Sequence, residues 1–250
     1  MELTVLGNNG GFPKGDNACS SFLIQTDEAN FLFDCGPGCI SKLGEVISID
    51  ALTGIFISHF HQDHYSDLLC VVHAYEIGAE LFGWKPLTVY SPTPPDELRK
   101  VIETSYINNV YFDQLPGNEM TLFHEDLILE IQKIKHSNGY DSYALNVFNN
   151  EQKISFTGDI KSWSDKEAEF FKKADILVVD ASIPLSYQDE DAKHLSPTSA
   201  IRLGEKADVD RIILTHFYPV FEFSEYMNEI QNSVPKKPVY LPKSLESFIA

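Results

Sequence analysis

The stretch Ser-His-Phe-His-Gln-Asp-His, residues 58–64, directly follows a short apolar run and carries the strongest signal in the chain. His59 and His61 are two positions apart, so their imidazoles leave the same side of an extended segment. The turn that follows can aim Asp63 and His64 at a neighbouring point. Three imidazoles and a carboxylate so close together have no purpose in an apolar core, where an unpaired charge costs several kcal/mol. The stretch therefore predicts a metal site.

Imidazole and carboxylate ligands together suit zinc or another divalent first-row metal. The spacing differs from the helical H-E-x-x-H arrangement, in which the histidines are four positions apart. A pair of metal ions needs more ligands than this stretch supplies, and we expect them at other strand ends. His136, Asp159 and His216 each follow an apolar run and precede a polar or glycine-containing loop, where sites usually lie. A lone histidine there is more often structural, and this alternative stays open for His136.

The composition limits the size and charge of the partner. With 250 residues and 43% hydrophobic content, the chain suits one globular domain, which we expect to span residues 1–250. Its 19 basic and 37 acidic residues give a net charge of −18, and the resulting negative field repels polyphosphate backbones. We therefore expect a small-molecule or short nucleotide substrate and no tight binding of a long nucleic acid.

The cysteines and the apolar segments indicate the compartment. The four cysteines form no C-x-x-C pair and no regular framework, so reduced and mostly buried thiols are expected. The N-terminus has neither a cationic start nor a long apolar run, and no stretch reaches about 18 uninterrupted apolar residues. These features predict a cytoplasmic protein without a membrane segment.

The order of predicted elements indicates an α/β architecture. Short strands dominate the first part of the chain, and strands alternate with helices in the rest, which favours two sheets covered by helices. The expected strands are residues 3–6, 21–25, 31–34, 53–58, 87–90, 126–135, 143–148, 153–157, 176–179 and 211–214. The expected helices are residues 36–43, 67–80, 94–103, 165–171, 197–206 and 223–230.

Several motifs in a fixed order make the chain resemble a known family. They are Gly-Asn-Asn-Gly-Gly-Phe-Pro at 7–13, Asp-Cys-Gly-Pro-Gly at 34–38, the 59–64 cluster, His136, Thr-Gly-Asp at 157–159, His-Leu-Ser at 194–196 and Leu-Thr-His-Phe at 214–217. Together they resemble the metallo-β-lactamase superfamily, and within it the ribonuclease Z-like branch. The resemblance spans nearly the whole chain and implies a four-layer αβ/βα sandwich, in agreement with the expected elements.

The same resemblance implies a dinuclear metal centre. It assigns three ligands to each metal ion, with the carboxylate of Asp159 bridging the two ions. The ligands of the first metal are His59, His61 and His136, and those of the second are Asp63, His64 and His216. The expected cofactors are two divalent ions, Zn²⁺ in the first place, although Mn²⁺ and Fe²⁺ accept the same ligands.

His194 separates the branches of this family. Its surroundings resemble the ribonuclease Z-like pattern of a histidine just before a capped helix, with Ser196 or Thr198 as the cap. In that branch the histidine faces the substrate and does not complete the metal sphere. From the residues alone, a solvated loop histidine is the simpler interpretation.

Two departures from the branch point away from tRNA processing. The stretch between His136 and Asp159 is too short for the protruding arm with which ribonuclease Z grips tRNA. In addition, Asp16 stands where the tRNA-processing enzymes tend to be basic. The chain therefore resembles the short, armless bacterial hydrolases of this branch, and a homodimer is expected from the same resemblance.

The expected chemistry is hydrolysis. Two ions that share one carboxylate lower the pKa of a bridging water toward neutrality, and the resulting hydroxide is the nucleophile. Asp63 ligates a metal and orients the hydroxide, while His194 donates a hydrogen bond to a phosphoryl oxygen or protonates the leaving alkoxide. Asp34 and Asp180 are candidates for orienting ligand imidazoles, with ordinary strand-end hydrogen bonding as the alternative.

We therefore expect a phosphodiesterase that acts on a small nucleotide, a cyclic phosphate or a short RNA end. A lactone, ester or thioester hydrolase with the same metal centre is the alternative. A non-catalytic metal-dependent binding protein is a third interpretation, which the complete ligand set disfavours because inactive relatives usually lose a ligand.

Overall fold

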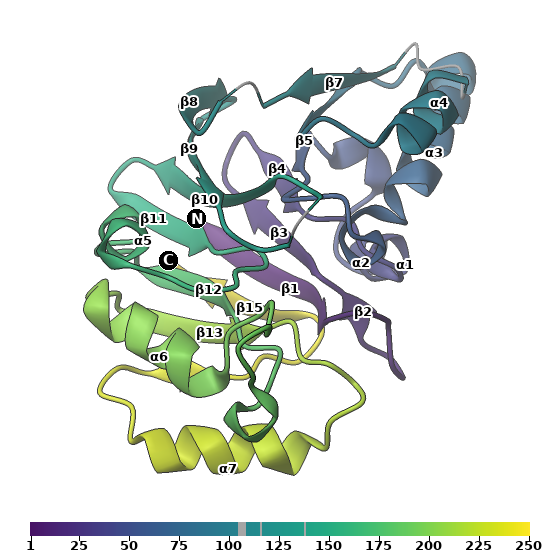
Figure 1. Cartoon of the computed structure of the whole chain (residues 1–250). Coiled ribbons are helices and arrows are strands. Elements are labelled where there is room, and N and C mark those ends of the chain that lie inside the picture. Colours follow the sequence, from purple (N-terminus) through teal and green to yellow (C-terminus); the bar gives the residue numbers. More distant parts are fainter. Residues whose placement is uncertain (105–108, 116, 138) are drawn as a thin grey trace.

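Two mixed β-sheets lie face to face in the computed structural model, which describes residues 1–104, 109–115, 117–137 and 139–250 (Figure 1). The first sheet contains, in spatial order, β15 (Glu246–Ile249), β1 (Glu2–Asn9), β3 (Ser21–Gln25), β4 (Asn30–Phe33), β5 (Gly54–Phe56), β6 (Leu87–Ser91) and β7 (Val110–Gln114), with β2 (Ala18–Cys19) beside β1. The second sheet contains β14 (Val239–Tyr240), β13 (Arg211–Thr215), β12 (Ile176–Asp180), β11 (Gln152–Phe156), β10 (Ser142–Asn149), β9 (Leu127–Ile134) and β8 (Glu119–His124).

Helices cover the outer faces of both sheets. Those on the side of the first sheet are α1 (Cys39–Leu43), α2 (Gln62–Tyr65), α3 (Leu68–Phe82) and α4 (Asp96–Thr104). Those on the side of the second sheet are α5 (Asp165–Phe170), α6 (Pro197–Lys206) and α7 (Phe223–Ser233). Two short 3₁₀ helices, η1 (Ile49–Ala51) and η2 (Leu185–Tyr187), lie in connections. Within the described residues, no helix is both long and apolar enough to span a bilayer.

Alternation of side chains along the strands builds these layers. In β4, Phe31 and Phe33 point into the space between the two sheets, whereas Leu32 points toward the helices outside. Residues of β12 alternate in the same way between the first sheet and the helices α5 to α7. Because both faces of such strands are covered, the strands are apolar throughout. The two helix-flanked mixed sheets confirm the predicted α/β sandwich.

Parallel strands in both sheets end at one shared rim. In the first sheet β4 and β5 run parallel to each other, and in the second sheet β11, β12 and β13 do. The carboxyl ends of parallel strands lie at the same edge of a sheet, where α/β proteins usually place their sites. The loops that follow these five strands therefore meet at the rim.

The sequence patterns missed several peripheral strands: β2, β7, β8, β14 and β15. β8 is the edge strand of the second sheet, and most of its side chains are exposed or half-buried, so it has no apolar run to predict it. β2 and β14 have two residues each, and three of the four residues of β15 are exposed. These strands are defined by pairing with a neighbour that is distant in sequence, which local patterns do not report.

The aromatic contact between the sheets gives a test of the core. Phe156 of β11 is fully buried and stacks on Phe33 of β4, with ring centroids 4.4 Å apart. We expect Phe156→Ala to lower the free energy of unfolding by about 3–5 kcal/mol, measured by denaturant unfolding at a fixed metal concentration. Phe123→Ala is the matched control, because that ring is 74% exposed on β8. Equal unfolding midpoints for the two variants would contradict this account of the core.

Candidate metal centre

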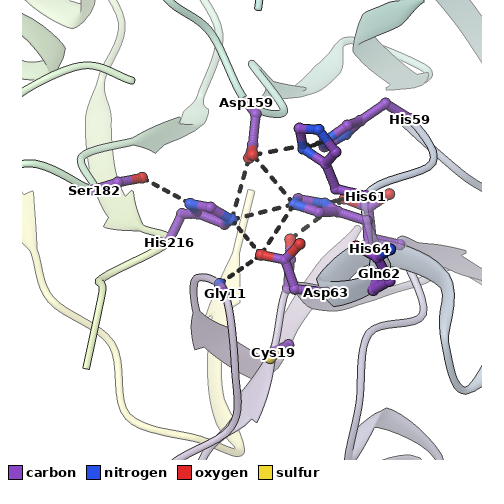
Figure 2. Close-up of polar contacts among 12 residues, drawn as sticks. Gly11, Cys19, His59, His61, Gln62, Asp63, His64, Asp159, Ser182 and His216 are labelled. Atoms are coloured by element: carbon purple, nitrogen blue, oxygen red, sulfur yellow. Dashed lines mark hydrogen bonds and ion pairs between the residues drawn. The ribbon is translucent and has the colours of Figure 1, made fainter. Parts of the chain in front are cut away.

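The ends of four strands bring all the predicted metal ligands together at the rim, and Figure 2 shows the ligand candidates that follow β5, β11 and β13. The 59–64 stretch follows β5, and the single turn of α2 directs Asp63 and His64 inward. The other three side chains follow β9, β11 and β13, and they are His136, Asp159 and His216. Apart from the half-buried His61, all of these side chains are buried. The structure thus joins residues that are far apart in sequence into one compact group of donor atoms.

The first donor cluster consists of His59, His61, His136 and Asp159. His61 Nδ1 lies 2.9 Å from His59 Nε2 and 3.1 Å from His136 Nε2. The Asp159 Oδ2 atom is 3.7 Å from His59 Nε2 and 3.6 Å from His136 Nε2. Three ring nitrogens and one carboxylate oxygen therefore surround a common point.

The second donor cluster consists of Asp63, His64 and His216. His216 Nε2 lies 3.1 Å from His64 Nε2 and 3.1 Å from Asp63 Oδ2. Asp159 reaches this cluster as well, with Oδ2 3.3 Å from His64 Nε2 and Oδ1 3.4 Å from His216 Nε2. Asp159 thus lies between the two clusters, as Figure 2 shows.

The spacing of these donor atoms fits metal ions. Ligand nitrogens about 2.0–2.1 Å from a tetrahedral zinc lie roughly 3.3 Å from one another. A neutral imidazole has one N–H donor and one acceptor nitrogen. His64 and His216 each donate through Nδ1 to another partner, so their Nε2 lone pairs face each other. A cation between two such lone pairs is the arrangement that satisfies both.

In four of the histidines, Nε2 faces the donor clusters and Nδ1 makes a hydrogen bond on the opposite side of the ring. His64 Nδ1 donates to Asp34 Oδ2 over 2.7 Å, and His216 Nδ1 donates to Ser182 Oγ over 2.7 Å. The corresponding partners of His59 and His136 are the hydroxyl of Ser58, at 3.1 Å, and the backbone carbonyl of Lys193, at 3.1 Å. Such contacts fix the tautomer and the orientation of a ligand ring.

Of the two aspartates predicted to orient imidazoles, Asp34 contacts a ring of the donor clusters directly and Asp180 does so through a serine. Asp34 is fully buried and also accepts the backbone N–H and the hydroxyl of Ser58, over 2.8 and 3.0 Å. Asp180 reaches His216 only indirectly, by accepting the hydroxyl of Ser182. Ser58 and Ser182 were not singled out from the sequence as partners, because a serine beside a strand end has no distinctive pattern.

The backbone is strained where it turns these side chains inward. Asp34 directly follows β4 with φ 59°, and His216 directly follows β13 with φ 64°. Residues other than glycine rarely adopt this left-handed conformation, and it costs of order 1–3 kcal/mol. Gly158 adopts the same conformation before Asp159, and an added Cβ there would lie 3.1 Å from a backbone oxygen of Tyr143. Three of the left-handed positions in the chain therefore present candidate ligands or their partners.

Burial and carboxylates act on the ring nitrogens in opposite directions. Burial lowers the pKa of His136 to about 4, so its imidazole is neutral and can ligate. Burial also acts to lower the pKa of His64, but the carboxylates of Asp159 and Asp34 outweigh it and raise that pKa well above its ordinary value. The second cluster therefore stabilises positive charge at this point, carried by a proton on His64 or by a metal ion in its place.

His194 lies on the wall of a cavity of about 570 Å³ that opens onto both donor clusters. The side chain is buried, so it is not a solvated loop histidine. Its Nδ1 donates to Asp180 Oδ2 over 3.0 Å, and its Nε2 lies 2.7 Å from the hydroxyl of Tyr218. Ser196 caps α6 as predicted, by accepting the N–H of Ser199. Tyr218 was missed from the sequence, although it lies two residues after His216.

Comparison with known proteins places this architecture in a family. A model of the β-lactamase superfamily domain matches residues 29–217. The chain belongs to the metallo-β-lactamase superfamily. The matched span contains both donor clusters and His194, and the buried histidine and aspartate groups within it support a dinuclear metal site. The protein is a metal-dependent hydrolase of this superfamily.

Individual relatives cover the whole chain. The probable metallo-hydrolase YhfI of Bacillus subtilis is 25% identical over 98% of both chains, and its crystal structure matches with a TM-score of 0.87 and 22% identity over 99% of both chains. The short form of human tRNase Z matches with a TM-score of 0.81 and 21% identity, covering 100% of this chain and 99% of that one. A diphosphatase of the PhnP family matches with a TM-score of 0.76 and 19% identity, covering 100% and 97%.

The contact between Asp34 and His64 gives a test of the second cluster. In Asp34→Asn the amide oxygen can still accept the Ser58 N–H, which leaves the amide nitrogen facing His64 Nδ1. His64 would then carry its proton on Nε2, the nitrogen aimed at the metal. We expect the affinity for the more weakly held of two Zn²⁺ ions to fall about 10- to 100-fold, measured by competition with a chelator.

The control for this measurement is Asp16→Asn, which changes an exposed carboxylate paired with Lys42. Wild-type affinity at both metals in the Asp34→Asn protein would show that the imidazole orientation does not depend on this contact.

Proposed function

We propose that the protein is a dinuclear phosphodiesterase that acts on a small nucleotide, a cyclic phosphate or a short RNA end. The observation that carries this proposal is the position of His194. Two hydrogen bonds hold its ring on the cavity wall, and its Nδ1 lies 3.8 Å from the central Asp159 carboxylate. Because Nδ1 donates to Asp180, Nε2 is the nitrogen that can donate to a phosphoryl oxygen, in place of its contact with the Tyr218 hydroxyl.

The metal assignments of this proposal follow the two donor clusters. His59, His61 and His136 would hold one ion, and Asp63, His64 and His216 the other, with Asp159 shared between them. Two divalent ions, when bound, would supply an activated water at neutral pH and positive charge for the phosphoryl oxygens. We propose Zn²⁺ as the native metal, because three imidazoles with a carboxylate are typical zinc ligands, although Mn²⁺ and Fe²⁺ bind similar sets.

The chain's own residues divide the remaining work. Gly11 donates its N–H to Asp63 Oδ2 over 2.5 Å, which fixes the orientation of this carboxylate toward the cavity (Figure 2). His194 donates to the phosphoryl oxygen or protonates the leaving alkoxide, and Asp180 holds its ring through Nδ1. Tyr218 places a hydroxyl beside His194 Nε2 on the same wall.

The size and charge of the cavity favour a small substrate. Its volume of about 570 Å³ is in the range of small-molecule sites. Asp189, Asp191 and Lys193 line the cavity. The net charge of −18 opposes a long polyanion. Similarity to a protein named tRNase Z and to a protein named a diphosphatase supports chemistry at phosphorus.

A substrate panel tests the reaction class. Protein reconstituted with Zn²⁺ is assayed with bis(p-nitrophenyl) phosphate, lactones and thioesters, and its metal content is measured on the same sample. We expect phosphodiester turnover at two metal ions per chain, and loss of turnover on chelation. Turnover of lactones, esters or thioesters alone would select the alternative hydrolase. Two bound metal ions without any turnover would favour a binding protein.

Substitution of His194 tests its role within this reaction. We expect His194→Ala to lower kcat about 10²- to 10⁴-fold, the usual contribution of general acid–base catalysis, while two metal ions remain bound. His73→Ala is the matched control, because that imidazole is exposed on α3. If His194→Ala protein loses a metal ion, His194 is a ligand and the assignment is wrong.

A further inference from the structure

One carboxylate on α7 contacts both ends of the segment that carries His194. The Glu229 Oε2 atom accepts the backbone N–H of Leu185 over 2.7 Å, and Oε1 accepts the backbone N–H of Thr198 over 2.8 Å. We call residues 185–198 the His194 segment. Its two ends are thus tied to a single side chain of a helix that lies outside the cavity.

The His194 segment forms one wall of the cavity beside the donor clusters. Between its ends it contributes Tyr187, Asp189, Asp191, Ala192, Lys193 and His194 to the lining. Gln188 closes the segment internally, because its amide donates to the backbone oxygens of His194 and Ile183 over 3.0 and 3.2 Å. The segment is therefore a closed loop, and the placement of its ends contributes to the placement of His194, together with the contacts of the ring to Asp180 and Tyr218.

Both N–H groups bound by Glu229 suit a carboxylate. Thr198 lies in the first turn of α6, where backbone N–H groups have no partner within the helix. Negative charge is favoured there by the helix dipole, and hydrogen bonds to a charged acceptor are shorter and stronger than neutral ones. Leu185 begins η2, so its N–H also needs an acceptor from elsewhere.

Neighbouring residues of α7 hold other parts of the same wall. Glu225, one turn before Glu229, accepts the hydroxyl of Tyr187 over 2.8 Å. Tyr226 donates its hydroxyl to the backbone oxygen of Ser182 over 2.6 Å and accepts the N–H of Tyr218 over 3.0 Å. This face of α7 therefore contacts segments on both sides of His194, and Glu229 is its contact with the His194 segment's ends.

We propose that Glu229 is a positioning residue that keeps His194 in place relative to the metal centre by fixing both ends of the His194 segment. Glu229 does not line the cavity and does not touch a metal ligand. It acts through His194, and its effect on turnover rests on the proposed function.

Kinetics with bis(p-nitrophenyl) phosphate provide the first test. We expect Glu229→Ala to lower kcat about 10- to 100-fold, since a small displacement of a catalytic group costs up to about 10², with two metal ions still bound. Glu229→Gln is expected to fall between Ala and wild type, because the amide oxygen replaces only one of the two acceptors. Asn228→Ala, on an exposed position of the same helix, is the matched control and should retain wild-type kcat.

A double substitution separates positioning from general damage. If Glu229 acts through His194, Glu229→Ala has no further effect on kcat in the His194→Ala protein, since the two losses are not additive. Additive losses, or equal loss in the Ala and Gln variants, would overturn the proposal.

Hydrogen exchange tests the same contact without any substrate. In Glu229→Ala we expect the amides of Leu185 and Thr198 to exchange faster, with exchange in the rest of α6 and in α7 unchanged. Wild-type exchange at both amides, or faster exchange throughout both helices, would overturn the proposal. If the wild-type protein does not hydrolyse phosphodiesters, the proposed function fails while this measurement still decides the role of Glu229.

Discussion

The structure depends on ring nitrogens whose lone pairs face one another in a buried space. Without a cation, two hydrogen-bond acceptors face each other. Burying unpaired acceptors in the interior of a protein costs free energy. The arrangement exists because the far side of each of four rings has its own acceptor: Ser58, Asp34, Lys193 and Ser182. When the imidazoles are neutral, these four contacts hold the single proton of each ring on the side away from the centre. The resulting requirement for positive charge suits these clusters to metal ions.

The fold supplies the stiffness that this arrangement needs. Phe33 and Phe156 stack between the sheets, and each lies within three residues of a carboxylate at the rim, Asp34 and Asp159. The strained conformations of Asp34 and His216 persist because well-packed strands precede them. Packing of the phenylalanines in the core therefore helps to fix the orientation of the carboxylates at the rim.

The layers and the ligand candidates can be predicted from the sequence because both leave local patterns. The 59–64 stretch combines unusual residue types with a spacing that only an extended segment followed by a turn can use. The roles of Ser182, Tyr218 and Glu229 could not be predicted in this way, because each depends on a contact with a segment distant in the chain or on a common residue type. The edge strand β8 could not be predicted either, because most of its side chains are exposed or half-buried and its sequence contains no apolar run.

The chain order of the ligands also sets the order in which the two donor clusters can be completed. All members of the first cluster precede β12, so a chain still being synthesised holds them before its last third is made. The second cluster needs His216, which follows β13. Because a chain is synthesised from its N-terminus, the donors of the first cluster are available before His216 is. Completion of the second cluster therefore requires β13 to pair with β12, and a metal ion bound there would report that this pairing has formed.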